Sequence, residues 1–243
     1  LHQNTHFKSV KLPQASCYVF STFIAAVTIL FNELGKGRFG VVYLVREVES
    51  EKCFAAKFIK TRRRSYRELA HEEISILQSL SHENIIRYVD SYSGPASIVI
   101  VMEYLDGGEL FVKIADEDFS LTEADCVGFV SQVCLGLQYL HSLSSVHLDL
   151  KVTNVYFVNE QVPGLQFSFQ PENIICSEKN QIKIIDFGTA KRLRPGSQVR
   201  AMCGTAEFLA PEIVNYDDIT VASDMWAVGA DIRWCKHCDS IQV

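Results

Sequence analysis

The glycine pattern Gly35-x-Gly37-x-x-Gly40 constrains the fold more than any other feature, because the residues after it decide which nucleotide-binding turn it forms. In dinucleotide-binding folds a helix follows these glycines, and an acidic residue comes about 20 positions later. Here residues 41–45 have a strand-forming composition and position 60 is lysine, which argues against a nicotinamide-dependent oxidoreductase. The pattern therefore predicts a loop between two strands whose backbone can approach phosphates. The alternative is a glycine-rich hairpin without a ligand.

A lysine and a glutamate follow the glycines in an order that fits a phosphate-binding site. Lys57 lies on a strand predicted from Cys53 to Ile59, where its ammonium can reach the phosphates of a nucleotide. Glu73 lies on a helix predicted from about Tyr66 to Leu80, and from there it can pair with Lys57. Glu72 is a neighbouring rival for the lysine, and a solvated helix charge is the alternative for Glu73.

Hydrophobic patterns divide the chain into a strand-rich part and a helix-rich part. Thr122 is placed to cap a second predicted helix, which extends to Ser142. A β-rich unit followed by a helical unit predicts an α+β fold with two lobes. Further strands are predicted at Val27–Leu34, Val41–Val48, Ile85–Tyr92 and Ile98–Tyr104. We expect a first lobe at 27–104 and a second at 105–229, with an N-terminal piece at 1–26 and a tail at 230–243.

Composition narrows the classes of partner. Hydrophobic residues make up 48% and charged residues 21%, as in an ordinary soluble globular protein, and the net charge of −6 argues against nucleic acid as a partner. The apolar stretch Tyr18–Phe31 is shorter than the about 20 residues that span a bilayer, so we expect no membrane partner. The scattered cysteines fit reduced thiols in a cytoplasmic protein. Cys235 and Cys238 have the spacing of half a zinc site, but no second pair follows them.

Several short motifs follow the glycine pattern in a fixed order, and they contain the residue types that carry phosphoryl transfer. With the glycines and Lys57, they make the chain resemble the protein kinase family over residues 30–229. The sequences of these motifs are most similar to those of the myosin light chain, titin/twitchin and death-associated kinases of the calmodulin-dependent kinase group. The motifs are His147-Leu148-Asp149-Leu150-Lys151, Pro171-Glu172-Asn173-Ile174-Ile175, Ile184-Ile185-Asp186-Phe187-Gly188, Gly204-Thr205-Ala206-Glu207-Phe208, Ala210-Pro211-Glu212 and Asp224-Met225-Trp226.

The resemblance implies a kinase that uses ATP and Mg²⁺ to phosphorylate serine or threonine in proteins. Asp149 would accept the proton of the substrate hydroxyl, and Lys151 would stabilise the transferring phosphoryl group. Asn173, which would also act in catalysis, and Asp186 would hold Mg²⁺.

The resemblance also implies an ATP site. Lys57 would bind the α- and β-phosphates, and Glu73 would fix its ammonium. Met102 would lie at the back of the adenine pocket, and the backbone from Glu103 to Leu105 would form hydrogen bonds with adenine. The other residues implied in ATP binding are Leu34, Gly35, Lys36, Gly37, Arg38, Phe39, Gly40, Val41, Val42 and Ala55.

Three positions bear on the substrate and on regulation. Glu109 matches a family glutamate that meets a basic residue near the target serine or threonine, and a carboxylate at a helix start is the alternative. Thr205 would contact the substrate backbone. Leu148 replaces an arginine that docks phosphorylated activation loops, which suggests activity without that switch. By resemblance, we expect a protein substrate with basic residues near its target, calmodulin regulation in a full-length parent, and a cytoplasmic protein associated with muscle or the cytoskeleton.

Residues 152–170 interrupt a motif that in the family reads continuously from Lys151 to the sequence beginning at Pro171. We interpret this segment as a retained intron, because valine codons begin with GT, one glutamine codon ends with AG, and 19 codons keep the reading frame. A genuine inserted loop is the alternative. Asn154 also satisfies the spacing to Asp149, but Asn173 precedes Asp186 by the family's interval of 13 residues.

The chain departs from the family again after Gly229, where a different sequence replaces the expected helices. Glu212 would then lack its usual arginine partner, and apolar surface would be exposed. Because the chain starts with Leu1, we expect its N-terminus to be a fragment boundary. These departures leave a second hypothesis beside the active kinase: a catalytically impaired pseudokinase or scaffold that binds ATP or partners without turnover.

Overall fold

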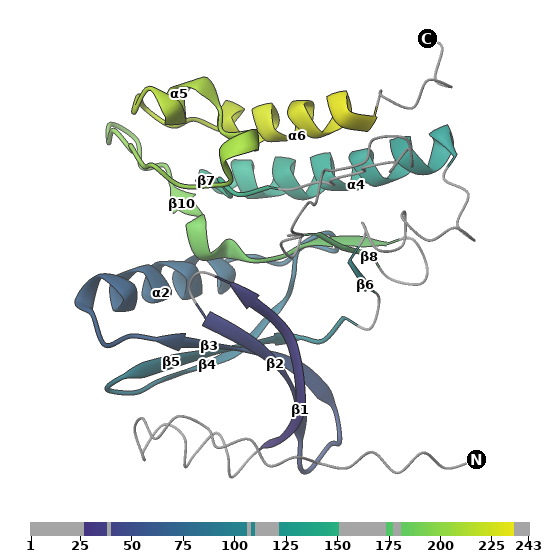
Figure 1. The fold of residues 1–243 in the computed structure, drawn as a ribbon, viewed down its shortest axis with the longest axis vertical. Helices are drawn as coiled ribbons and strands as arrows, with labels where there is room; N and C mark the ends of the chain where they lie inside the picture. The colour runs from purple at the N-terminus through teal and green to yellow at the C-terminus, as the bar shows by residue number, and fades with distance from the viewer. Residues whose placement is uncertain are drawn as a thin grey trace, which may run out of the picture. The chain divides into compact units, whose positions relative to one another are not determined.

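The computed structural model describes residues 27–37, 40–105, 108–109, 122–150, 174–176 and 181–235 (Figure 1). The chain divides into two compact units. The first consists of Leu1–Gln78 and Arg87–Tyr104, and the second consists of Ser79–Ile86 and Leu105–Val243. The predicted N-terminal piece, the interruption at 152–170 and the end of the predicted tail lie outside the described residues.

A five-stranded antiparallel sheet forms the first unit, in the order β1-β2-β3-β5-β4 (Figure 1). The strand β2 pairs Val45 with Phe54 of β3, and β3 pairs Ala56 with Val101 of β5. These side chains form one buried cluster, because alternate residues of each strand point to the same face of the sheet. The strands are β1 (Val27–Gly37), β2 (Gly40–Glu47), β3 (Cys53–Lys60), β4 (Tyr88–Ser93) and β5 (Ser97–Glu103).

Helix α2 (Arg64–Leu77) belongs to the same unit and contacts β5. Its buried residues Ala70, Ile74 and Leu77 recur at helical spacing and define the face that packs inward. The helix begins two residues before the predicted start at Tyr66. Its N-cap residue, Arg63, makes no side-chain capping bond, and no acidic residue lies in the first turn.

One predicted strand was partly wrong. The apolar run from Ile85 predicted a strand that reaches Tyr92, but β4 begins only at Tyr88. Ile85 forms a parallel bridge with Ile184, and the Ile86 amide donates to the Ile184 carbonyl oxygen at 3.0 Å. Both isoleucines are buried in the second unit. Their hydrophobicity therefore reflects a contact with a distant segment rather than a place in the five-stranded sheet.

The second unit is built around the long helix α4 (Glu123–Ser142). Thr122 caps it as predicted: the Asp125 amide donates to the Thr122 hydroxyl, and the Thr122 amide donates to the Asp125 carboxylate. Val133, Leu137 and Leu140 are fully buried along one face of the helix. The remaining elements are β6 (Gly108–Glu109), β7 (Ser145–Val146), β8 (Ile174–Cys176), β9 (Ile182–Ile184), η1 (Phe187–Thr189), β10 (Lys191–Arg192), η2 (Ala206–Phe208), α5 (Pro211–Val214) and α6 (Ala222–Cys235).

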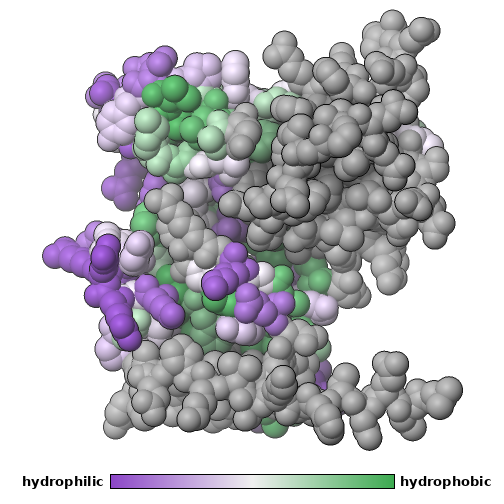
Figure 2. All heavy atoms as spheres, in the orientation of Figure 1, coloured by the Kyte–Doolittle hydropathy of each residue, from purple (hydrophilic) through white to green (hydrophobic). Residues whose placement is uncertain are grey.

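Hydrophobic residues lie at the surface over α5 and the start of α6 (Figure 2). The side chains of Val214, Tyr216, Met225 and Trp226 are all exposed there. Beneath them Ile213, Ala227 and Val228 are buried. Exposed apolar surface on this part of the chain agrees with the expectation from the sequence. Among the described residues, no helix combines the length and the hydrophobicity that crossing a membrane requires.

Candidate active site

The glycine pattern lies in the hairpin between β1 and β2, where Gly37 pairs with Gly40 and Gly35 pairs with Val42. The glycines differ in whether their positions leave room for a side chain. A Cβ atom at Gly40 would collide with the carbonyl oxygen of Phe58, so this glycine lets β2 approach β3 closely. A Cβ atom at Gly35 would meet nothing within 4 Å. Leu34 and Lys36 are exposed, Val41 is half-buried, and Arg38 and Phe39 lie outside the described residues.

The lysine of β3 forms an ion pair with the glutamate of α2. Lys57 Nζ lies 2.6 Å from Glu73 Oε1, and the exposed fractions of the two side chains are 7% and 3%. The predicted pair is therefore present, and the neighbouring Glu72 does not replace Glu73 in it. A buried ion pair holds the ammonium group in one place, because both charges have lost most of their contact with water.

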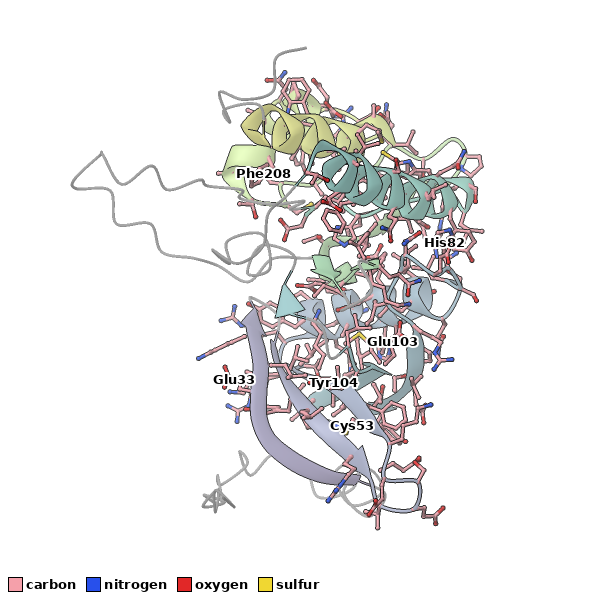
Figure 3. The ribbon with its side chains drawn as sticks, turned by 90° about the vertical axis from the view of Figure 1, so that its right-hand side faces the viewer. Glu33, Cys53, His82, Glu103, Tyr104 and Phe208 are labelled. Carbon is pink, nitrogen blue, oxygen red and sulfur yellow. The ribbon has the colours of Figure 1, made fainter. Side chains whose placement is uncertain are left out.

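Residues predicted to surround adenine lie on neighbouring strands. Ala55 of β3 pairs with Met102 of β5, and Met102 is buried. The Glu103 amide donates to the Arg87 carbonyl oxygen at 3.0 Å, so this N–H is already used within the sheet. Glu103 ends β5 and Tyr104 follows it (Figure 3). Leu105 is half-buried and belongs to the second unit.

The chain around Asp149 is held by a buried carboxylate in the second unit. Asp224, which is 1% exposed, accepts hydrogen bonds from the amides of His147 and Leu148 at 2.9 and 2.8 Å. Its Oδ2 atom also lies 2.8 Å from His141 Nε2. Leu148 has a φ angle of 68°, an unusual conformation for a residue other than glycine. The buried acceptor stabilises this strained turn, which ends at Asp149.

Thr205 lies directly against Asp149. Its hydroxyl donates to Asp149 Oδ1 at 2.9 Å, and both residues line a small hollow with Phe208 of η2. Gly204, with a φ angle of 104°, makes this approach available. A Cβ atom there would lie 2.7 Å from the Leu148 carbonyl oxygen. The glycine before Thr205 is therefore required by the contact between two segments.

Asp186 occupies a second strained turn. Its φ angle is 56°, and its Oδ1 atom accepts a hydrogen bond from the Gly188 amide at 3.3 Å at the start of η1. The next residue, Phe187, is buried, and its ring packs edge-on against the ring of His147 with a distance of 4.8 Å between the ring centroids. This packing fixes the direction in which the chain leaves Asp186.

The segment between Asp186 and Thr205 is held by contacts within the second unit. Strand β10 pairs with β7, and the Ile219 amide donates to the Val199 carbonyl oxygen at 2.9 Å. Arg200 Nε donates to Asp218 Oδ1 at 2.9 Å, and this hydrogen bond raises the pKa of Arg200. Leu148 is buried in an apolar cluster with Ile213 and Ile219, against which this segment packs.

Other predicted site residues are less fully described. Glu109 lies in β6, where its backbone pairs with Ile175 of β8. Lys151 and Asn173 lie outside the described residues, as do the alternative Asn154 and the possible zinc ligand Cys238. In the described part of the chain, no group of three or more histidine, cysteine, aspartate or glutamate residues is arranged to hold a metal ion.

Two further findings concern residues around the site. The Glu212 carboxylate, for which the sequence predicts the loss of an arginine partner, accepts a hydrogen bond from the Ser223 hydroxyl. The roles of Asp224 and His141 were missed. The motif that begins at Asp224 was the only available signal, and its hydrogen bonds to residues about 75 positions away could not be inferred from spacing.

Comparison with known proteins decides the family. The sequence model of the protein kinase domain matches residues 29–166 and 169–233. The chain belongs to the protein kinase family. A human relative, myosin light chain kinase family member 4, is 43% identical over 198 residues, which cover 81% of this kinase chain and 46% of the relative. This kinase chain spans less than half the length of the curated relatives it matches.

Solved structures agree with this assignment. The kinase resembles the twitchin kinase region of C. elegans with a TM-score of 0.71 and 36% identity, over 85% of this chain and 33% of the other. It also resembles the autoinhibited serine kinase domain of the giant muscle protein titin, with a TM-score of 0.68 and 33% identity over 85% and 58% of the two chains. The predicted family, its calmodulin-dependent group, and the fold with a β-rich and a helical lobe are confirmed.

Proposed function

We propose that this kinase transfers the γ-phosphoryl group of ATP to serine and threonine hydroxyls of protein substrates. The observation that carries the proposal is the position of Asp149. Asp224 holds the backbone before it, and the Thr205 hydroxyl binds its Oδ1 atom at 2.9 Å. A carboxylate fixed in this way can accept the proton of a substrate hydroxyl while the hydroxyl oxygen attacks phosphorus.

The nucleotide would be bound mainly by the first unit. The buried pair of Lys57 and Glu73 supplies an ammonium group in a fixed position, as binding the α- and β-phosphates requires. The hairpin at Gly35 and Gly37 would cover the phosphates, and the surface between Ala55 and Met102 would receive adenine. The role of Lys151, which we place at the transferring phosphoryl group, rests on the family motif alone.

The described residues fit Mg²⁺ as the metal. Asp186 supplies a carboxylate, and Mg²⁺ takes one or two protein carboxylates together with phosphate oxygens and water. Asp186 and Asn173 would hold the ion. When bound, Mg²⁺ neutralises charge on the phosphates.

The proposed substrate class rests on the match of Glu109 to a glutamate of the family motif. We propose substrates with basic residues near the target serine or threonine, recognised by Glu109, with Thr205 against the substrate backbone. A relative is a myosin light chain kinase and a structural neighbour belongs to a giant muscle protein, which supports a cytoplasmic role near muscle or the cytoskeleton. Membership of the calmodulin-dependent group supports calmodulin as a regulatory partner.

The test separates a kinase from a scaffold that only binds ATP. We would measure Mg²⁺-dependent ATP binding and transfer of labelled phosphate to a basic serine peptide, for the chain and for a variant without residues 152–170. We expect both binding and transfer by at least the variant, since the family motif is continuous there. If both proteins bind ATP and neither of them transfers phosphate, the proposal is overturned in favour of the scaffold. Transfer by the variant alone would show that the interruption blocks an otherwise functional site.

A further inference from the structure

A run of three arginines precedes a serine at the start of α2. Arg62, Arg63, Arg64 and Ser65 are all exposed, and the Arg64 side chain is 92% exposed. Arg63 is extended, with φ and ψ angles of −96° and 139°, and the helix begins only after it. The run plays no part in the Lys57–Glu73 pair, so the proposed function does not account for it.

From this arrangement we propose that Ser65 is a phosphorylation site, modified by a second copy of this kinase. The proposal rests on the proposed function, because a kinase that selects basic residues near its target would find them immediately before Ser65. In the reaction, Ser65 Oγ attacks the γ-phosphorus of ATP and forms the new P–O bond. The bond to the β,γ-bridging oxygen breaks, ADP leaves with its electron pair, and the Asp149 carboxylate of the second copy takes the hydroxyl proton.

The local structure lets Ser65 reach a second copy. Arg62 and Arg63 already leave the sheet in an exposed segment, so only the first turn of α2 must open. The hydrogen bond that closes this turn, from the Arg67 amide to the Arg63 carbonyl oxygen, is long at 3.3 Å. The first amides of a helix have no partner within it, so opening this turn costs few hydrogen bonds.

A phosphate on Ser65 would also change α2 itself. The helix start lacks both a capping side chain and an acidic residue, and a phosphate would supply the missing negative charge there. Glu68 is the nearest acidic residue on the helix, but Arg64 already pairs with it at 2.8 Å. Because the same helix carries Glu73, phosphorylation would stabilise the element that positions Lys57.

Another serine provides a matched control. Ser75 is also exposed and lies on the same helix, but Glu72 and Glu73 precede it in place of the arginines. Ser197 is a competing candidate, since Arg194 stands three positions before it. The Ser197 hydroxyl, however, already donates to the Arg194 carbonyl oxygen within a turn.

The experiment uses the full chain carrying Asp149→Asn as substrate. It is incubated with ATP and either the wild-type chain or an unrelated kinase that selects basic sequences, and modified residues are mapped by mass spectrometry. We expect both enzymes to label Ser65, the label to vanish in Ser65→Ala, and Ser75→Ala to leave it unchanged. If the wild-type chain labels a basic peptide but neither enzyme labels Ser65, or only Ser197 is labelled, the inference fails while the proposed function stands.

The experiment also shows whether a kinase other than this one modifies Ser65. If only the unrelated kinase labels Ser65 and the wild-type chain labels no peptide, the second copy is overturned as the modifying enzyme. Peptide labelling by the variant without residues 152–170 then decides the proposed function, which falls if that variant also labels no peptide. Hydrogen exchange of the phosphorylated chain then tests the effect on α2. We expect amides at 64–69 to exchange about threefold more slowly than in the unmodified chain. Unchanged exchange would overturn the stabilising role.

Discussion

Lys57 Nζ of β3 lies 2.6 Å from Glu73 Oε1 of α2, and both side chains are more than nine-tenths buried. Changing Glu73 to glutamine would remove the carboxylate charge that lies 2.6 Å from the buried lysine ammonium. We expect a loss of about 3–5 kcal/mol in the free energy of unfolding, measured by urea denaturation. Glu68→Gln is the matched control, because Glu68 forms an exposed ion pair on the same helix and should cost less than about 1 kcal/mol. Equal losses in the two variants would contradict the structural role of the buried pair.

Thr205 tests the arrangement around Asp149. Thr205→Val removes the hydroxyl that donates to Asp149 Oδ1 while keeping the shape of the side chain. We expect kcat/KM for a basic serine peptide to fall by roughly 10- to 100-fold, because a hydrogen bond to a charged group contributes about 1.5–3 kcal/mol. Thr205→Ser keeps the hydroxyl and should retain most of the rate. A Thr205→Val variant with the wild-type rate would show that this contact plays no part in turnover.

The sequence predicted the regular elements where local pattern dominates. Strands β2, β3 and β5 lie within one residue of their predicted bounds, because β-branched and apolar residues alternate or cluster there. The prediction for β4 was wrong at its start, because Ile85 and Ile86 pair with Ile184 far along the chain. Local hydrophobicity cannot distinguish a strand residue from one buried by a distant segment.

In the candidate site, too, the sequence predicted some residues but not the contacts between distant segments. Order along the chain was enough to select Lys57 and Glu73, and the structure pairs them. The contacts that Asp224 makes with His141 and the backbone of His147 join residues far apart in sequence. They depend on how α4, α6 and the turn before Asp149 pack together, which no residue pattern specifies.

Alanine substitutions at Gly196 and Gly204 distinguish the energetic cost of backbone strain from that of steric crowding. Gly204 and Gly196 both have positive φ angles, but a Cβ atom would collide with the Leu148 carbonyl oxygen only at Gly204. Gly196→Ala should cost about 1–2 kcal/mol of unfolding free energy from the backbone conformation alone. Gly204→Ala should cost more, since Thr205 must also move away from Asp149. Thermal unfolding and peptide kinetics would check both effects, and equal behaviour of the two variants would refute the crowding argument.

Tyr92 gives a prediction at alkaline pH. Burial and a hydrogen bond with Asp90 raise the pKa of Tyr92 to about 12. An unfolded tyrosine loses its proton near pH 10, so between about pH 10 and 12 the unfolded state releases a proton that the folded state keeps. The stability that Tyr92 contributes is therefore complete below pH 10 and is lost as the pH rises toward 12. In Tyr92→Phe the urea-unfolding free energy should fall less over this range, whereas Tyr66→Phe, which removes an exposed hydroxyl, should follow the wild type.

The most direct test of kinase activity compares two aspartates in one assay. Transfer of labelled phosphate from ATP to a basic serine peptide would be measured for the chain, for Asp149→Asn and for Asp217→Asn. Asp217 is exposed and does not line the hollow that contains Asp149 and Thr205. The proposed role of Asp149 predicts that Asp149→Asn lowers the rate by about 10²- to 10⁴-fold. Asp217→Asn should keep the wild-type rate. A wild-type rate no higher than that of Asp149→Asn would contradict the proposal that Asp149 serves phosphoryl transfer in this chain.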